Sequence, residues 1–513
     1  MKNPNAGMKD KILCWLDNDL LHFGIAKYLK EKHDCDMYTI IDINKHGKKF
    51  FQTQEFVKFN KIWYYRDFIS KPKEKPDLDY LKYFEEKYGI NLWEIAYTEG
   101  YFYKYNEYYK FNYNEILSIL EQECKLFETI LNESKPNFLI TKLVDYHQNR
   151  LLRDLCKSMG IKILMLSPTR FGYRSTISTI LDEVVNLEKT NIDIKNEDKL
   201  KINLKNYVNK YNISKQENEA KSRERASFKN YLKASSKFLI FICNKEYRNS
   251  YYGNYGRTRL KVLVKEGSLL LKKVFRNSFL NHHCIRDIEK NVKFVYFPLH
   301  FEPERALASK MPYYMNQPEV IINIAKSLPI EYKLYVKEHN AMKLMSWRNL
   351  SFYKKILELP NVVLVHPSVE SDEILKKCSL VITIAGTTGI EAAFHNKPSI
   401  VFSDISYSIL PFVYRLKNIE DLPHVLRFML EKKVDFAALN QYVNCVDKNS
   451  FEFSLWKPIL DISDYFFMGG FLRDAEISNE KMKSFLENNR LKFELLANEH
   501  IKRIKENKNF LDG

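Results

Sequence analysis

The chain has 513 residues, of which 45% are hydrophobic, 14% aromatic and 28% charged, so it has enough apolar material to fold and is not intrinsically disordered. A single hydrophobic core stops growing at about 250 to 300 residues, and the length therefore predicts two sizeable domains. The formal net charge of +17 predicts attraction to an anionic partner, which can be nucleic acid, an acidic membrane face or a phosphorylated substrate.

Apolar runs and cysteines narrow the class further. The longest clean apolar run, residues 238–243, is far short of the ~20 residues that a membrane-spanning helix needs. The first ten residues lack an apolar signal core, so we expect a cytoplasmic protein. The eight cysteines form no C-x-x-C pair, and the run His282-His283-Cys284 has no second ligand pair nearby, so no metal site is expected.

The N-terminal region, residues 1–185, begins with a strand–turn–helix pattern. Residues 12–16 form an apolar run, Asp17, Asn18 and Asp19 a polar turn, and residues 20–29 a helical repeat. Similar units follow, with strands expected at residues 37–43, 137–141 and 161–166 and a helix at 148–159. Strands that alternate with helices predict a parallel sheet covered on both faces, which is a Rossmann-like α/β domain.

Two segments of this part of the chain leave more than one interpretation open. A tyrosine-dense stretch at residues 97–113 can either stack on sugar rings or supply ordinary buried area. Residues 186–290 are predicted to be a basic, largely helical linker, because residues 221–290 hold 17 Lys or Arg against 5 Asp or Glu. Basic residues interleaved with aromatics suit an anionic membrane surface, single-stranded nucleic acid, or a plain solvated helix.

The second α/β region, residues 291–440, is more regular. Strands are expected at residues 292–297, 332–336, 362–365, 380–384 and 399–402, and the helices between them at 318–328, 350–359, 371–377 and 388–395. This alternation predicts a doubly wound domain. Residues 441–513 are expected to form a helical, charged tail.

Polar residues follow each strand of this second domain, where open α/β sheets bind their ligands. His300, His339 and His366 fall at three such ends, and imidazoles there can donate to a phosphate or a sugar carboxylate. The loop after the strand at residues 380–384 contains Gly386 and Gly389, and glycines let the backbone approach a phosphate. The helix that follows this loop points its free N–H groups at the same anion. The alternative is a plain helix cap. The predicted donor-binding residues are His300, Glu304, Lys337, Glu338, His339, His366, Pro367, Gly386, Thr387, Thr388, Gly389 and Glu391.

Several of these motifs together resemble the bacterial capsule polysaccharide biosynthesis proteins. The resemblance is carried by the motifs at residues 296–300, 337–339, 363–367 and 386–392. It implies a GT-B-like fold, in which two Rossmann-like domains face a cleft and the donor lies on the C-terminal one. It also implies a glycosyltransferase, since the group includes transferases that use CMP-activated Kdo. His366-Pro367 matches a histidine–proline pair that contacts the nucleotide in CMP-sugar transferases.

The acceptor is expected to bind to the N-terminal domain, at the residues that follow its strands. Transfer needs a base near the acceptor hydroxyl, and Asp17, Asp19, Asp145 and His147 follow two of the expected strands. Arg170 and Arg174 are expected to hold an acidic acceptor. The donor domain contains no Asp-x-Asp motif, so catalysis without metal and without a cofactor beyond the CMP- or UDP-linked sugar is expected.

The leading hypothesis is therefore a glycosyltransferase that works on a lipid-linked or growing surface polysaccharide, peripherally on the inner face of the cell membrane. Two alternatives share the scaffold, a CDP-polyol phosphotransferase of the teichoic acid type and a UDP-sugar epimerase. A non-catalytic alternative is a basic protein that binds nucleic acid or membrane. No nucleic-acid partner is expected, because no RNA- or DNA-binding module is recognisable.

Overall fold

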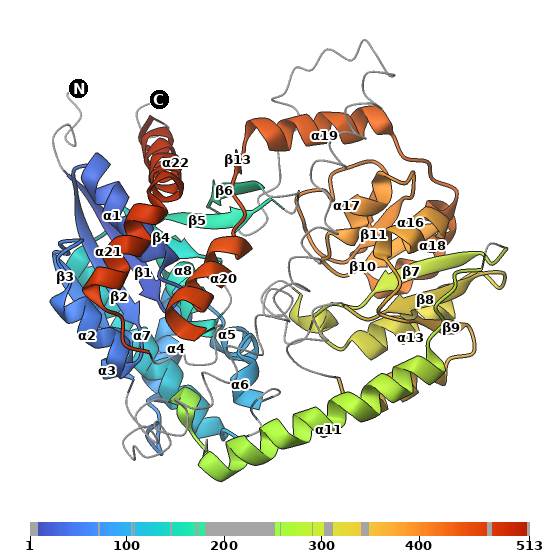
Figure 1. The fold of residues 1–513 in the computed structure, drawn as a ribbon, viewed down its shortest axis with the longest axis horizontal. Helices are drawn as coiled ribbons and strands as arrows, with labels where there is room; N and C mark the ends of the chain where they lie inside the picture. The colour runs from blue at the N-terminus through green and yellow to red at the C-terminus, as the bar shows by residue number, and fades with distance from the viewer. Residues whose placement is uncertain are drawn as a thin grey trace.

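The computed structural model describes residues 9–69, 72–103, 106, 108–143, 146–169, 171, 174–179, 252–256, 258–289, 291–301, 311–339, 348–468 and 475–509. Two lobes lie side by side, each built around a largely parallel sheet (Figure 1). Two helices run between them, α11 (Arg259–His283) and α19 (Phe436–Lys448). The predicted fold class, two Rossmann-like α/β domains of the GT-B kind, is confirmed.

The sheet of the N-terminal lobe has the order β13-β6-β5-β4-β1-β2-β3. Its core strands are parallel, and the pairs β5·β6 and β6·β13 at one edge are antiparallel. The strands predicted in this region are confirmed within a few residues. The bounds are β1 Asp10–Asp17, β2 Cys35–Asp42, β3 Lys61–Tyr64, β4 Phe138–Lys142, β5 Lys162–Pro168, β6 Arg174–Ser178 and β13 Phe451–Glu452.

Both faces of this sheet are covered. Along β1, Cys14 and Leu16 contact one core, whereas Leu13 and Trp15 contact the other, as the alternation of side chains in a strand requires. A strand buried on both faces must be apolar throughout, which is why the run was recognisable in the sequence. The covering helices are α1 Leu21–Lys32, α2 Lys45–Thr53, α3 Tyr65–Phe68, α4 Leu78–Tyr88, α5 Leu92–Tyr97, α6 Gly100–Tyr103, α7 Tyr113–Ser134 and α8 His147–Ser158.

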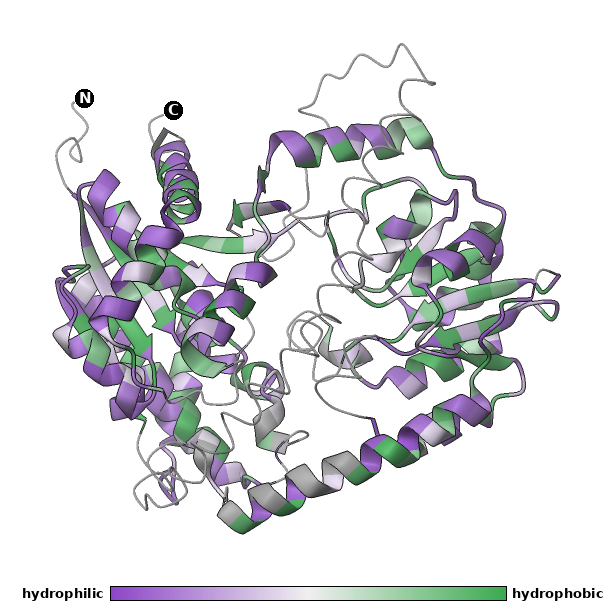
Figure 2. Cartoon of the chain, in the orientation of Figure 1, coloured by the Kyte–Doolittle hydropathy of each residue, from purple (hydrophilic) through white to green (hydrophobic). Residues whose placement is uncertain are grey.

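The sheet of the C-terminal lobe is parallel throughout and has the order β12-β11-β10-β7-β8-β9. All five predicted strands are present, and a sixth, β12, was not predicted. Figure 2 shows the hydrophobic strands at the centre of each lobe. The elements are β7 Phe294–Pro298, α13 Gln317–Ser327, β8 Lys333–Lys337, α15 Leu350–Leu357, β9 Val362–Val365, α16 Ser371–Lys377, β10 Leu380–Thr383, α17 Thr388–Ala393, β11 Ser399–Val401, β12 Val413–Arg415 and α18 Leu422–Leu430.

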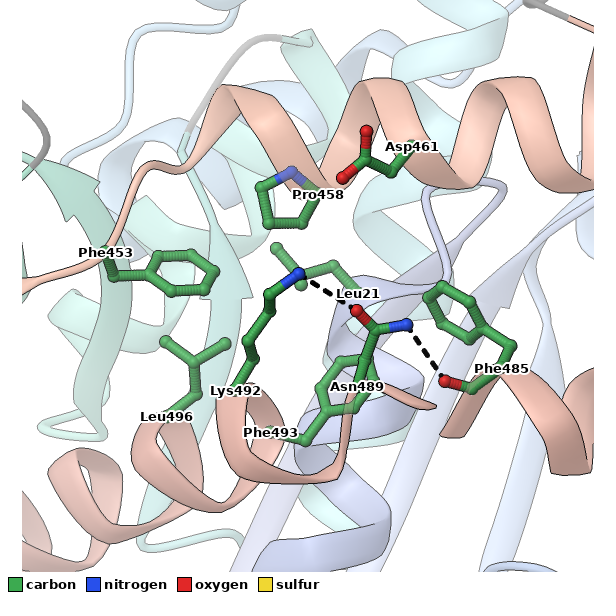
Figure 3. A pocket seen from close by; sticks show the side chains of 9 residues that line it. All are labelled: Leu21, Phe453, Pro458, Asp461, Phe485, Asn489, Lys492, Phe493 and Leu496. Carbon is green, nitrogen blue, oxygen red and sulfur yellow. Dashed lines mark hydrogen bonds between the residues drawn. The ribbon is translucent and has the colours of Figure 1, made fainter. Parts of the chain in front are cut away.

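The C-terminal tail is helical as predicted, and it packs on the N-terminal lobe. After α19 the chain crosses back, pairs β13 with β6, and continues as α20 (Trp456–Phe467), α21 (Asn479–Asn488) and α22 (Arg490–Asn509). These helices share one hydrophobic core with β1 and α1. A small hollow remains between them and the start of α1, where Lys492 donates to Asn489 and Asn489 donates to the Phe485 carbonyl (Figure 3).

The contact between α1 and α22 is close enough to be tested. A Cβ added at Gly24 would lie 2.2 Å from Cε1 of Phe493. We expect Gly24→Ala to destabilise the N-terminal lobe by about 1 to 3 kcal/mol, the usual cost of overpacking, measured as a lower urea midpoint. Glu31→Ala, at an exposed position of the same helix, should leave the midpoint unchanged. Combining Gly24→Ala with Phe493→Ala should cost less than the sum of the two, and strict additivity would contradict the contact.

Candidate functional site

Each sheet reverses its strand order beside its first strand. In the N-terminal lobe β2 lies on one side of β1 and β4 on the other, and in the C-terminal lobe β8 and β10 flank β7 in the same way. The connections that leave the two central strands turn to opposite faces, so a crevice opens at the carboxyl ends of the strands, which is where ligands bind in this fold. Both crevices contain predicted site residues.

In the C-terminal lobe His300 bridges the crevice. Its Nε2 lies 3.2 Å from both the Thr383 hydroxyl and the Ile384 amide nitrogen, and 3.4 Å from the Ala385 nitrogen. The backbone N–H groups can only donate, so Nε2 receives them through its lone pair. His300 was predicted to donate to a phosphate, but its Nε2 cannot do so here because it accepts the backbone N–H groups of the loop after β10.

The glycine-containing loop after β10 is fixed from two further sides. The Gly386 amide donates to the Thr383 hydroxyl at 3.1 Å, and the Tyr407 hydroxyl donates to the Gly386 carbonyl. A Cβ at Gly386 would lie 2.6 Å from Thr383 Oγ1, and one at Gly389 would lie 2.5 Å from the Tyr407 hydroxyl. A side chain at either position would displace these neighbours, and the two hydrogen bonds at Gly386 hold the backbone of this loop.

The two threonines of this loop are half-buried. The Thr387 hydroxyl donates to the Glu391 carboxylate at 2.6 Å and does not cap helix α17. The alternative of a plain side-chain cap by Thr387 is therefore wrong. Glu391, predicted to reach a ribose, instead has one carboxylate oxygen on Thr387.

The motif after β8 is mostly structural. Glu338 is buried and accepts from Arg348 at 2.9 Å and from the Tyr353 hydroxyl, so the prediction that it serves as an acid, a base or a hydroxyl acceptor is not supported by its surroundings. Burial and the Glu338 charge raise the pKa of the Tyr353 hydroxyl far above its usual value. Lys337 is buried and donates to Ser371 at 3.0 Å. His339 is exposed at the rim.

The His366-Pro367 pair lies at the end of β9, where the last turn of α11 meets it. His366 Nδ1 lies 2.6 Å from the Ser368 hydroxyl, and it accepts from the Ser368 amide at 3.2 Å. Its Nε2 lies 3.2 Å from Oδ1 of Asn281, to which Arg286 also donates at 2.7 Å. His366 is half-buried, Pro367 is buried and Arg286 is exposed, so fixed positive charge lies beside this histidine.

The crevice of the N-terminal lobe holds Asp17 and Asp19 together. Lys142, the last residue of β4, forms an ion pair with Asp17 across the strand-order reversal and lies 3.7 Å from Asp19. Burial, and next the Asp19 charge, raise the pKa of Asp17 to about 6, against the opposing effect of Lys142. Although burial alone would raise it, Lys142 and then His22 hold the pKa of Asp19 below its usual value. One carboxylate is therefore ready to take a proton near neutrality, while its neighbour stays ionised.

Behind this acid pair lie two buried histidines. His22 Nδ1 is 3.9 Å from Asp19, and His500 of α22 donates from Nδ1 to the Leu496 carbonyl at 2.7 Å. Burial lowers the pKa of His500 to about 4, with a smaller contribution from His22. Helix α22 of the C-terminal tail therefore packs next to His22, which in turn lies next to Asp19.

His147, another predicted catalytic residue, is fully buried at the start of α8. Its ring nitrogens lie 3.1 Å from Glu99 and 2.9 Å from Glu123. Burial by itself would lower the pKa of His147, but the two carboxylates outweigh it and raise the pKa to about 9. Since both nitrogens are engaged and the side chain has no exposed surface, the expected catalytic role of His147 is corrected to a structural one.

Arg174 was expected to hold an acidic acceptor, and the structure gives it another partner. Its guanidinium donates to the carbonyls of Asp447 and Ser450, both at 2.7 Å, and pairs with the Asp447 carboxylate at 3.1 Å. These groups lie at the end of α19, so Arg174 satisfies helix carbonyls that have no helical partner. Asp145, Arg170 and Glu304 lie outside the described residues.

Four residues that shape the candidate sites were not predicted from the sequence: Lys142, Thr383, Tyr407 and Phe171. Lys142 ends the strand beside β1, and its position at a carboxyl end was a usable signal. Phe171 follows β5 but packs in the core of the other lobe, 5.6 Å from Phe394 between ring centroids. Nothing in the local sequence indicates that contact.

Within the described residues, no group of three His, Cys, Asp or Glu side chains is arranged to hold a metal ion. His283 instead lies 2.9 Å, through Nδ1, from the Phe279 carbonyl one helical turn earlier. Among the same residues, no helix is long and apolar enough to cross a membrane.

Comparison with known proteins confirms the resemblance drawn from the motifs. Residues 190–418 match the capsule polysaccharide biosynthesis protein family. No curated protein matches the chain in sequence.

Among solved structures, the β-Kdo 2,7 transferase KpsC of Thermosulfurimonas dismutans shares 11% identity, with 66% of this chain and 89% of that chain covered and a TM-score of 0.32. S. aureus MnaA with UDP shares 10% identity over 89% of this chain and 97% of that chain, with a TM-score of 0.27. Anabaena HepE with UDP and glucose shares 10% identity over 88% and 98%, with a TM-score of 0.25. These likenesses are remote, and no step of the proposed mechanism rests on them.

The bridge at His300 can be tested without a ligand. His300→Ala removes the acceptor of the Ile384 and Ala385 amides, so we expect these amides to exchange with deuterium at least about tenfold faster, which corresponds to the loss of one typical hydrogen bond. Hydrogen–deuterium exchange over residues 383–391 measures this. His424→Ala, at an exposed position of α18, is the control and should not change the exchange. Equal rates in His300→Ala and the unmodified protein would exclude the bridging role.

Proposed function

We propose that this protein is a glycosyltransferase that moves a sugar, Kdo or a related acidic sugar, from a nucleotide donor to a lipid-linked or growing surface polysaccharide. The observation that carries the proposal is the set of side chains at the two strand-order reversals, where this fold binds ligands. One has a rigid glycine loop suited to a phosphate, and the other has an aspartate whose pKa is raised to about 6. The family match over residues 190–418 supports it, because that stretch includes all the loops of the first crevice.

In this proposal the C-terminal lobe binds the donor. The backbone of the Gly386–Gly389 loop approaches the phosphate, with the Thr387 and Thr388 hydroxyls beside it. Arg286, next to His366, supplies positive charge for the leaving nucleotide, and His366 lies where it can contact that nucleotide. His300 and Tyr407 are positioning residues, since they contact the loop and not the donor. Glu338 has no direct part, because Arg348 and Tyr353 engage it.

The N-terminal lobe then supplies the base. Asp17 accepts the proton of the acceptor hydroxyl, the hydroxyl oxygen forms a bond to the anomeric carbon, and the bond from that carbon to the nucleotide phosphate oxygen breaks. Asp19 stays ionised and keeps Lys142 in place. Phe171 follows the carboxyl end of β5 in the N-terminal lobe but packs in the core of the C-terminal lobe. This contact helps to keep the donor and acceptor sites close to each other.

We further propose that the acceptor is lipid-linked and that the protein works peripherally at the inner face of the cell membrane, which its charge of +17 favours. The sugar is the co-substrate, and no cofactor or metal ion takes part in this proposal.

Nucleotide binding tests the donor half. We expect CMP to raise the melting temperature of the purified protein more than CDP, UDP or GDP, because ligands that bind only the folded state stabilise it. Gly386→Ala should abolish the shift, since its Cβ collides with Thr383 and the loop must move. A response to CDP alone would favour the polyol-phosphate alternative, and one to UDP alone a UDP-sugar enzyme. No response to any nucleotide would contradict the proposal.

The pH dependence of turnover tests the base. A base must be deprotonated to act, so kcat/KM should rise with pH through about 6 and then level off. Asp17→Asn should lower kcat at least about 100-fold, the size expected when a general base is lost. Asp34→Asn, an exposed surface pair with Lys9, is the control and should keep full activity. Retained activity in Asp17→Asn would exclude the role, and activity that EDTA removes and Mn²⁺ restores would exclude catalysis without metal.

A further inference from the structure

Helix α11 is held at both ends and lies on the outside of the molecule between them (Figure 1). Just before it, Tyr252 is buried in the N-terminal lobe, where its ring lies 5.9 Å from that of Phe102. Near its end, Leu280 is buried in the core of the C-terminal lobe. The helix between these anchors is therefore fixed relative to both lobes.

One face of this helix exposes a row of large apolar side chains, which we call the α11 stripe. The exposed fractions lie between 63% and 72%, for Leu260, Val264, Leu271, Val274 and Phe275. At about 100° per residue these positions fall within one narrow arc of the helix. The row is interrupted at Gly267 and Ser268 and is densest from Leu271 to Phe275. Single exposed apolar residues are ordinary, but several on one face mark a surface that contacts something apolar.

Positive charge accompanies the stripe. Residues 259–283 contain six Lys or Arg and one Asp or Glu. Of the exposed lysines, Lys261 and Lys272 border the stripe at about 100° per residue, whereas Lys273 lies on the far side of the helix. Lysines beside an apolar face can keep their ammonium groups at lipid phosphates while their methylene chains lie along the apolar surface. A helix with an apolar face and flanking lysines is typical of helices that lie in the interface of an anionic membrane.

We propose that α11 is the membrane-contacting element of this protein and binds an anionic phospholipid surface through the α11 stripe and its lysines. The helix then lies flat in the headgroup region with its apolar side chains inward. This deepens the proposed function, because it names the surface at which a lipid-linked acceptor is met, and it rests on that function only for its purpose. The contact itself needs neither donor nor acceptor.

Charge decides between this partner and the other surfaces that could cover the stripe. A second copy of this chain would bring the same exposed lysines against each other, because residues 259–283 hold six Lys or Arg, of which only Arg276 is shown to be buried, and one Asp or Glu. Anionic lipid supplies the opposite charge along the whole stripe, and each lysine near such a surface contributes about fivefold in binding.

Flotation of the full chain with vesicles tests the proposal without any measurement of activity. We expect binding to phosphatidylcholine vesicles that contain phosphatidylglycerol, and little binding to phosphatidylcholine alone. The double variant Leu271→Glu, Phe275→Glu should weaken binding at least tenfold, as apolar contact is lost and charge is repelled. The control is Ile330→Glu, which places one such charge at a fully exposed apolar residue of the C-terminal lobe and should leave binding within about fivefold of that of the unmodified chain.

The variant Lys261→Gln, Lys272→Gln removes the charges that border the stripe and leaves the apolar residues in place. It should weaken binding to anionic vesicles at least tenfold, and added salt should have less effect on what remains. Binding of the unmodified chain that neither double variant weakens would overturn the proposal, as would the absence of binding to anionic vesicles.

Two further measurements on the stripe variant exclude the other occupants. A lower melting temperature would mean that the stripe packs against the chain itself, and a shift from dimer to monomer in size-exclusion chromatography would mean that it packs against a second copy. Either result would overturn the proposal. Vesicle binding by a protein that binds no nucleotide would leave this inference standing while the proposed function fails.

Discussion

Both lobes depend on the reversal of strand order beside the first strand of each sheet. At that point the connections turn away to opposite faces, and the ends of two neighbouring strands are left without a covering helix. Each lobe joins these ends with side chains, Asp17 with Lys142 in one and His300 with Thr383 in the other. The loop that carries Gly386 to Glu391 starts from the second joint, so its position follows from that joint.

The two joints differ in their chemistry. The N-terminal joint consists of charged groups. Burial, repulsion between the carboxylates and attraction to Lys142 together raise the pKa of Asp17 and lower that of Asp19. The C-terminal one consists of hydrogen bonds to a histidine lone pair, which fix a backbone without placing a charge in the crevice. A charged joint suits proton transfer and an uncharged one suits the binding of an anion. The asymmetry therefore fits the proposed division between acceptor and donor lobes.

The sequence predicted the strands that are buried on both faces, such as β9, whose bounds agree fully. It did not predict β3, β6, β12 or β13, because these short strands lie at or next to the sheet edges and lack a run of buried apolar residues. For the site, it predicted which positions follow strands, but not how their side chains are used. Glu338 and His147 are engaged by residues remote in sequence, and such pairings depend on tertiary packing that local patterns do not contain.

The return of the chain to the N-terminal lobe has a consequence for synthesis. That lobe needs β13 for its sheet edge and α20 to α22 for its core, so it cannot be completed until those segments have left the ribosome. The C-terminal lobe, whose sheet and covering helices are made earlier, can be complete first. Domains usually finish folding from the N-terminus onward as they are made, and here the order is reversed. The first half of the nascent chain must therefore wait with apolar surface uncovered, which makes it the part most dependent on chaperones.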